Sequence, residues 1–175
     1  MDAHVEEVLD QVGAAPGDDL ETILQKVESA IGIPLRLEAP MHKWVGTPLT
    51  AAMAIHERHI SLFYAPHRSR VYQLHCIYHE IGHALLRTAC RHISKEEMNA
   101  LSIPIEGVIS AHARKLTPTD TNASRNFDLH EIDRTRLTPA ARDFEASEEM
   151  VENFAYALAA RIRERPLTRM GEVFA

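Results

Sequence analysis

The chain has 175 residues, 45% of them hydrophobic and 25% charged, with a formal net charge of −6. This composition is typical of a globular protein that buries a substantial core, so we predict a single domain over residues 1–175. The acidic balance disfavours direct nucleic-acid binding, and the apolar runs are too short to cross a membrane. Because the acidic N-terminus lacks an apolar signal core, we expect a cytoplasmic protein.

The first part of the chain predicts two helices and a strand. Residues 3–12 carry valine and leucine at helical spacing, within an N-terminal helical arm over residues 1–16. Asp18 or Asp19 caps a second helix, which ends at a glycine before the strand-like residues 33–38. The two helices could serve as a docking arm for a partner or as a cover for a small sheet.

Residues 51–56 and 59–64 predict two strands of a hairpin that turns at Glu57 and Arg58. A polar segment then leads into a helix that we expect to begin at about Arg70.

That helix carries an H-E-x-x-H pattern, His79-Glu80-Ile81-Gly82-His83. Residues four apart lie on one helical face, so both imidazoles can reach one ion, and two imidazole nitrogens suit Zn²⁺. On a helical wheel with His79 at 0°, His83 falls at ~40° and Glu80 at ~100°. The opposite side, near ~200°, predicts a buried back made of Leu74, Ile77, Ile81, Ala84, Leu85 and Thr88. The alternative is an ordinary amphipathic helix with histidines on its polar face.

The two cysteines are predicted to be reduced thiols. Cys76 and Cys90 would be ~21 Å apart along one helix, too far for a disulfide. Cys76 falls near the metal-binding face and is a further candidate ligand, although the spacing favours the two histidines. His75 also lies on this face, where we expect a polar flank rather than a ligand.

The second half of the chain predicts more helix around a long loop. Residues 94–101 resemble a capped helix start, residues 105–116 suggest another helix, and residues 117–138 lack periodicity and predict a loop. Pro139 opens the last helical region, which we expect to run from about residue 146 to residue 165.

A catalytic zinc ion needs a third protein ligand. Ala89 stands where a third histidine would mark a metzincin, so that class is excluded and a later glutamate is the remaining common solution. On the last helix Glu148 lies ~75° from the apolar stripe formed by Val151, Phe154, Leu158 and Ile162, whereas Glu149 lies ~175° from it.

Glu148 is therefore the preferred ligand, with Glu149 and Glu106 as alternatives. If no metal binds, the glutamates of the last helix are surface charges that the helix dipole favours near a helix start. Glu152, one turn later on the same side, could accept a hydrogen bond from a ligating histidine.

These motifs resemble the ImmA/IrrE-type metallopeptidases, bacterial regulatory zinc proteases. The matching features are the strand near Ile33-Pro34, the strand over 60–64, the H-E-x-x-H pattern, and the segment Glu148-Glu149-Met150-Val151-Glu152-Asn153-Phe154-Ala155. The last aligns with the family's glutamate-ligand segment, with Val151 in place of the usual alanine. The resemblance implies an α+β, zincin-like fold: a small, mostly antiparallel sheet packed on the metal-binding helix, with further C-terminal helices.

We therefore expect a zinc-dependent metalloendopeptidase with Zn²⁺ on His79, His83 and Glu148. Glu80 would take a proton from the attacking water and pass it to the leaving amine. Candidates for stabilising the oxyanion are Tyr64, His67, Tyr72, His112 and His130.

The resemblance implies that the substrate is a separate helix-turn-helix repressor or antitoxin. Rival readings are a poorly cleaving zinc protein that acts by binding a transcription factor, and a toxin with another protein target. In zinc peptidases generally, the strand before the metal helix lines the cleft and pairs with substrate. Residues 59–65 could have that role, or they could form an ordinary edge strand.

Overall fold

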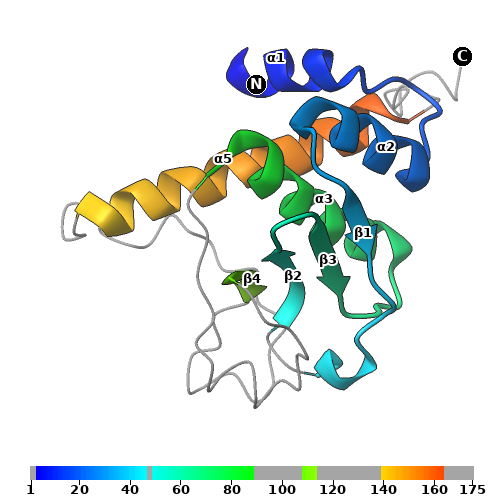
Figure 1. Cartoon of the computed structure of the whole chain (residues 1–175), viewed down its shortest axis with the longest axis vertical. Helices are drawn as coiled ribbons and strands as arrows, with labels where there is room; N and C mark the ends of the chain where they lie inside the picture. The colour runs from blue at the N-terminus through cyan, green and yellow to red at the C-terminus, as the bar shows by residue number, and fades with distance from the viewer. Residues whose placement is uncertain (1–2, 47–48, 89–107, 114–138, 164–175) are drawn as a thin grey trace, which may run out of the picture.

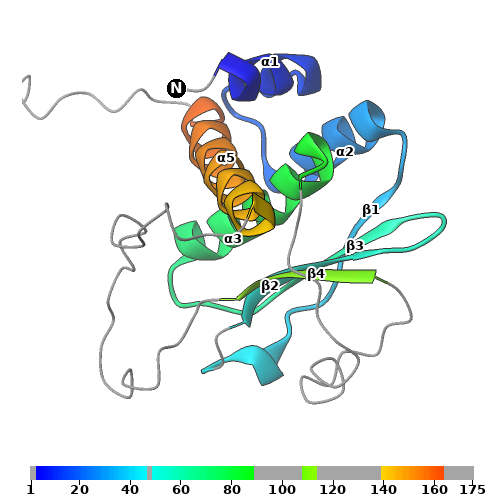
Figure 2. The same cartoon turned by 90° about the vertical axis from the view of Figure 1, so that its left-hand side faces the viewer.

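Four α-helices lie on one face of a four-stranded sheet in the computed structural model, which describes residues 3–46, 49–88, 108–113 and 139–163 (Figures 1 and 2). In chain order the elements are α1 (Ala3–Val12), α2 (Leu20–Ile31), β1 (Leu35–Leu37), the 3₁₀ helix η1 (His42–Trp44), β2 (Leu49–Ile55), β3 (Ile60–Tyr64), α3 (Arg70–Leu86), β4 (Val108–Ala113) and α5 (Pro139–Arg161). The predicted α+β class is confirmed.

The sheet has the strand order β1-β3-β2-β4, with β1 parallel to β3 and the other two pairs antiparallel. The predicted hairpin is confirmed, since β2 and β3 pair antiparallel and His56 N–H donates to the His59 carbonyl at 2.9 Å.

The interpretation of residues 59–65 as an edge strand, or as a strand open to substrate, is wrong. β3 has β1 on one side and β2 on the other, and beyond β1 Met41 N–H donates to the Tyr64 carbonyl at 2.9 Å. Alternation of polar and apolar residues indicates which face of a strand is buried, but it does not indicate which strands lie beside it. The position of β3 within the sheet therefore could not be predicted from the sequence.

The helix predicted over residues 105–116 is also wrong, because the structure has β4 there, paired antiparallel with β2. Val108 and Ile109 are β-branched and fit a strand, and pairing with the outer edge of β2 outweighs a weak helical periodicity. The features predicted over residues 94–101 and 117–138 lie outside the described residues.

The predicted helix boundaries of the first half agree with the structure. Asp19 caps α2 by accepting a hydrogen bond from Thr22 N–H at 2.8 Å, and Gly32 ends α2 with a left-handed φ of 72°. α3 begins at Arg70 as expected, whereas α5 begins at Pro139, earlier than residue 146.

Helix α1 packs onto the C-terminal half of α5 and onto α2 rather than onto the sheet (Figure 1). Val5 and Leu9 are fully buried, and the Arg161 guanidinium pairs with Glu6 and with Asp10 across the contact. The N-terminal helix is therefore part of the hydrophobic core.

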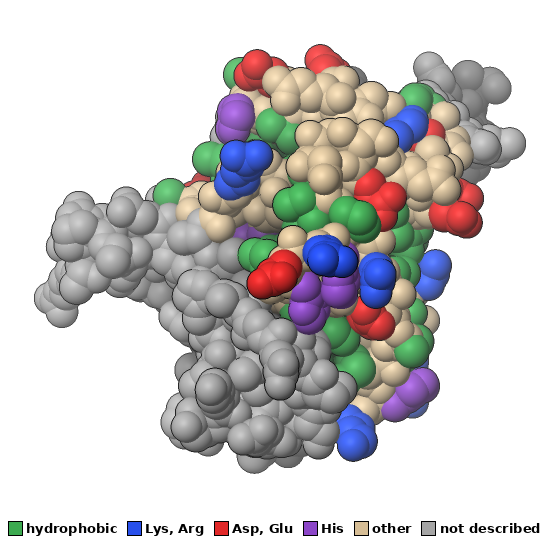
Figure 3. All heavy atoms as spheres, in the orientation of Figure 1, with side chains coloured by type: hydrophobic (Ala, Val, Ile, Leu, Met, Phe, Trp, Pro, Cys, Tyr) green, Lys and Arg blue, Asp and Glu red, His purple; other side chains and the backbone are tan. Residues whose placement is uncertain are grey.

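The surface in Figure 3 intermixes acidic, basic and hydrophobic side chains over the described residues of that face.

Within the described ranges, no helix combines the length and the apolar character needed to cross a membrane.

Candidate metal centre

Helix α3 carries the H-E-x-x-H residues, and its two histidines face Glu148 of α5. His79, Glu80 and His83 are buried, with exposed fractions of 1%, 1% and 4%. On the opposite side Ile77 and Ile81 belong to the hydrophobic core, which confirms the predicted buried back at those positions. Burying a charged or polar side chain is costly unless it is paired, so the two histidines require partners in a neighbouring element.

Helix α5 supplies that neighbouring element. Its predicted apolar stripe is confirmed, with Val151, Phe154 and Leu158 at most 1% exposed. The contact with α3 is close because Gly82 has no side chain: a Cβ there would lie 2.9 Å from Phe154 Cδ1 and 3.0 Å from Val151 Cγ1. This approach brings Glu148 beside the two histidines.

Glu148, His79 and His83 form a compact group of donor atoms. The two Nε2 atoms lie 3.2 Å apart, Glu148 Oε2 lies 3.4 Å from His79 Nε2, and Glu148 Oε1 lies 3.3 Å from His83 Nε2. One ligand atom from each residue can be chosen so that all lie within 4.8 Å of one another. The three residues are thus close enough to hold a metal ion.

The spacing of these atoms also fits a small tetrahedral ion. Ligands at ~2.0–2.1 Å from such an ion are about 3.3 Å apart, which matches the separations found here. The donor set of two imidazole nitrogens and a carboxylate is typical of zinc sites.

Glu152 bridges His75 and His79, on the side of His79 away from Glu148. Its Oε2 is 3.1 Å from His79 Nδ1 and its Oε1 is 3.0 Å from His75 Nε2. The predicted contact of Glu152 with a ligating histidine is confirmed, the histidine being His79, and His75 forms the expected polar flank. A carboxylate on Nδ1 fixes the orientation of the imidazole and leaves Nε2 directed at Glu148.

The carboxylates also determine the protonation of His79. Burial lowers the pKa of the imidazole, but hydrogen bonds with Glu148 and Glu152 outweigh burial and raise the pKa to about 9. Burial raises the pKa of Glu152, but His75 and His79 outweigh it and hold that pKa well below its ordinary value. The two carboxylates therefore favour the positively charged form of the His79 imidazole.

Thr88 holds His83 in the same way, a contact that was not predicted from the sequence. Thr88 Oγ1 lies 2.9 Å from His83 Nδ1. The prediction that Thr88 belongs to the buried back assumed that the helix continues, but α3 ends at Leu86 and Arg87 is left-handed with a φ of 50°. That reversal turns Thr88 toward the histidine, and nothing in the helical pattern signals it.

The remaining candidates fall outside this group. Glu149 is exposed, and Glu106 lies outside the described residues. Cys76 is buried but is not part of the group, which is the one such cluster of three or more residues found within the described ranges.

The residues considered for the oxyanion are scattered. The His67 and Tyr72 rings are in contact, with centroids 4.6 Å apart, near the start of α3. Tyr64 ends β3 and His112 lies on β4, while His130 and Cys90 lie outside the described residues.

Fold and site together define an α+β protein in which two buried histidines and a half-buried glutamate are close enough to hold a metal ion. The chain matches no protein-family model, no curated protein and no solved structure. The chemistry of the site therefore has to be inferred from its own residues.

Proposed function

We propose that this protein is a zinc-dependent metalloendopeptidase of the ImmA/IrrE type, with a zincin-like fold. The observation that carries the proposal is the spacing of 3.2–3.4 Å among the donor atoms of His79, His83 and Glu148, with buried Glu80 on the same helix. These three residues would hold the zinc ion. When bound, the ion acidifies a water molecule and polarises a carbonyl group.

The protein's own groups supply the rest of the chemistry. Glu80 lies within the H-E-x-x-H pattern and is 1% exposed, so its carboxylate is poised to act without competing solvent. It accepts a proton from the attacking water and donates that proton to the leaving amine. A metal that served structure alone would not need a base at this position.

Two hydrogen bonds prepare the histidines for this role. The Nδ1 atoms of His79 and His83 are occupied by Glu152 and Thr88, so each Nε2 remains the ligand atom. Preorganised ligands lose less entropy when the ion binds, which favours tight and geometrically selective binding.

We propose as substrate a separate protein of the helix-turn-helix repressor or antitoxin class, as the resemblance implies. The test is to incubate the zinc-loaded protein with a helix-turn-helix regulator encoded beside it, and to follow cleavage by mass spectrometry.

The wild type is compared with Glu80→Gln, which retains the three ligands. The expected result is a defined cut that Glu80→Gln slows by at least about 100-fold at unchanged zinc content. Cleavage that survives in Glu80→Gln would contradict the mechanism. Stable binding of the regulator without any cut would favour the rival function, a zinc protein that acts by binding its transcription-factor partner.

A further inference from the structure

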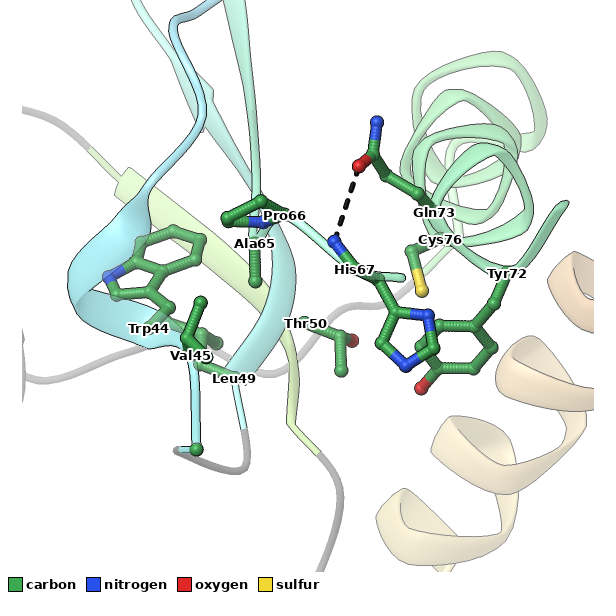
Figure 4. Close-up of a pocket in the computed structure, with 11 residues that line it drawn as sticks. Trp44, Val45, Leu49, Thr50, Ala65, Pro66, His67, Tyr72, Gln73 and Cys76 are labelled. Carbon is green, nitrogen blue, oxygen red and sulfur yellow. Dashed lines mark hydrogen bonds between the residues drawn. The ribbon is translucent and has the colours of Figure 1, made fainter. Parts of the chain in front are cut away.

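A cavity of about 110 Å³ lies beside the N-terminal half of α3 (Figure 4). Three segments form its walls: η1 with the start of β2, the residues that follow β3, and α3 itself. The side chains that shape it are Trp44, Leu49, Ala65, Pro66, Tyr72 and Cys76.

Among the described residues, those that line the cavity include no Asp, Glu, Lys or Arg. Trp44, Leu49 and Cys76 are at most 4% exposed and form a buried, largely apolar base. The Gln73 side chain, which also lines the cavity, accepts a hydrogen bond at Oε1 from the backbone N–H of His67 at 3.3 Å. An anionic occupant would lose its hydration here without gaining an opposite charge from a Lys or Arg among the described lining residues.

The cavity is adjacent to the candidate metal centre. Tyr72, Cys76, His79 and His83 follow one another at helical spacing along one face of α3, and Cys76 is only ~4.5 Å from His79 along the helix axis. Burial, with smaller contributions from the Glu80 and Glu152 carboxylates, raises the pKa of the Cys76 thiol to about 11. Both carboxylates therefore lie within electrostatic reach of the cavity wall.

The mouth of the cavity exposes hydrophobic surface. Val45 is 60% exposed and Tyr72 is 38% exposed, and both line the cavity. An exposed apolar rim around an apolar hollow is typical of a binding site. The volume is below the ~150 Å³ of a cavity that accepts benzene, so it suits an aliphatic side chain rather than an indole.

We propose that this cavity binds an aliphatic side chain of the protein substrate, such as leucine, next to the peptide bond that is cut. The proposal rests on the peptidase function proposed above and adds the class of substrate residue that the site selects.

The test uses the zinc-loaded protein and tripeptide hydroxamates, whose hydroxamate group chelates zinc. One series consists of glycine with a single leucine placed at each position in turn, and parallel series carry glutamate or tryptophan. Acetohydroxamate, which has no side chain, measures the metal centre alone. At one position leucine should increase affinity roughly 10- to 100-fold over glycine, whereas glutamate and tryptophan should not.

Two variants link that gain to the cavity. Ala65→Leu fills the cavity and Val45→Glu places a charge at its exposed mouth, and each should abolish most of the leucine gain while leaving acetohydroxamate affinity unchanged. Ala30→Leu, at an exposed position of α2, is the matched control and should keep the gain. Val45 is exposed, so its variant provides the test if Ala65→Leu does not fold.

The outcomes separate this proposal from the proposed function. If acetohydroxamate binds but no leucine position improves affinity by more than about threefold, the cavity is not a substrate site and the metal centre stands. A gain that persists in both variants also overturns the assignment. If acetohydroxamate does not bind the protein, the proposed zinc peptidase fails and the cavity assignment fails with it.

Discussion

Gly82 and Phe154 are in direct contact across the interface of α3 and α5, where a Cβ at Gly82 would lie 2.9 Å from Phe154 Cδ1. The same glycine is the second variable residue of the H-E-x-x-H pattern. The contact determines how closely α5 approaches α3, and with it the position of Glu148 relative to His79 and His83.

Replacing Gly82 with alanine should therefore damage both stability and metal binding. On helix propensity alone Gly82→Ala would stabilise by about 1 kcal/mol, but overpacking of this kind costs about 1–3 kcal/mol. Because Phe154 and Val151 are both fully buried, we expect the upper part of that range and a net loss of about 1–2 kcal/mol. Urea unfolding measures the loss, and a zinc titration should show weaker binding. Phe154→Leu in the Gly82→Ala background should recover part of the loss, and a more stable single variant would contradict the packing described.

Removing the Glu152 carboxylate should weaken metal binding without removing a ligand. Glu152 holds Nδ1 of His79, and loss of such an outer contact typically costs 10- to 100-fold in metal affinity. Competition with a chromophoric chelator measures the zinc affinity of Glu152→Ala. Glu149→Ala, on the same helix but exposed, is the control and should bind as the wild type does. Equal affinities in the two variants would show that Glu152 does not orient the histidine.

The metal-free protein should lose stability as the pH rises. Two carboxylates outweigh burial and raise the pKa of His79 from 6.5 to about 9. A raised pKa means that the protonated imidazole stabilises the fold: the contribution is complete below pH 6.5 and is lost as the pH rises through about 9. Its size is on the order of 3 kcal/mol.

Urea unfolding of chelator-treated protein on both sides of this pH window measures the effect. Glu152→Gln, which removes one of the two carboxylates, should show a smaller loss. Constant stability across the window would contradict the coupling of His79 to Glu148 and Glu152. A metal ion must displace the same proton, so zinc affinity should fall as the pH is lowered.

Helix α1 should contribute to stability through its buried face more than through its ion pairs. Arg161 pairs with Glu6 and Asp10 near the surface, where such pairs are worth about 1 kcal/mol or less. Leu9 is fully buried, and truncating such a leucine typically costs 2–5 kcal/mol. Unfolding of Leu9→Ala and Arg161→Ala should show this difference. A stable Leu9→Ala protein would mean that α1 is not docked on α5 in solution.

Much of the site could be predicted because its signals are local. Helical spacing placed both histidines on one face of α3, and the apolar stripe of α5 oriented Glu148 and Glu152 toward them. Cap residues such as Asp19 and Gly32 marked helix ends correctly, because a cap needs only its own few neighbours.

The features that were missed depend on contacts between distant segments or on a single backbone reversal. β4 is a strand because β2 offers it an edge, and β3 is internal because β1 returns beside it. Thr88 reaches His83 only because Arg87 adopts a left-handed conformation. Neither a neighbour in the sheet nor a reversal of this kind leaves a periodic pattern in the sequence.

The central claim is that His79, His83 and Glu148 together hold one zinc ion. The most direct measurement is the zinc content of purified protein by elemental analysis, comparing the wild type with Glu148→Ala and Glu149→Ala. We expect one equivalent in the wild type and in Glu149→Ala, and a loss of zinc in Glu148→Ala. One equivalent retained in Glu148→Ala, or no stoichiometric zinc in the wild type, would contradict the account.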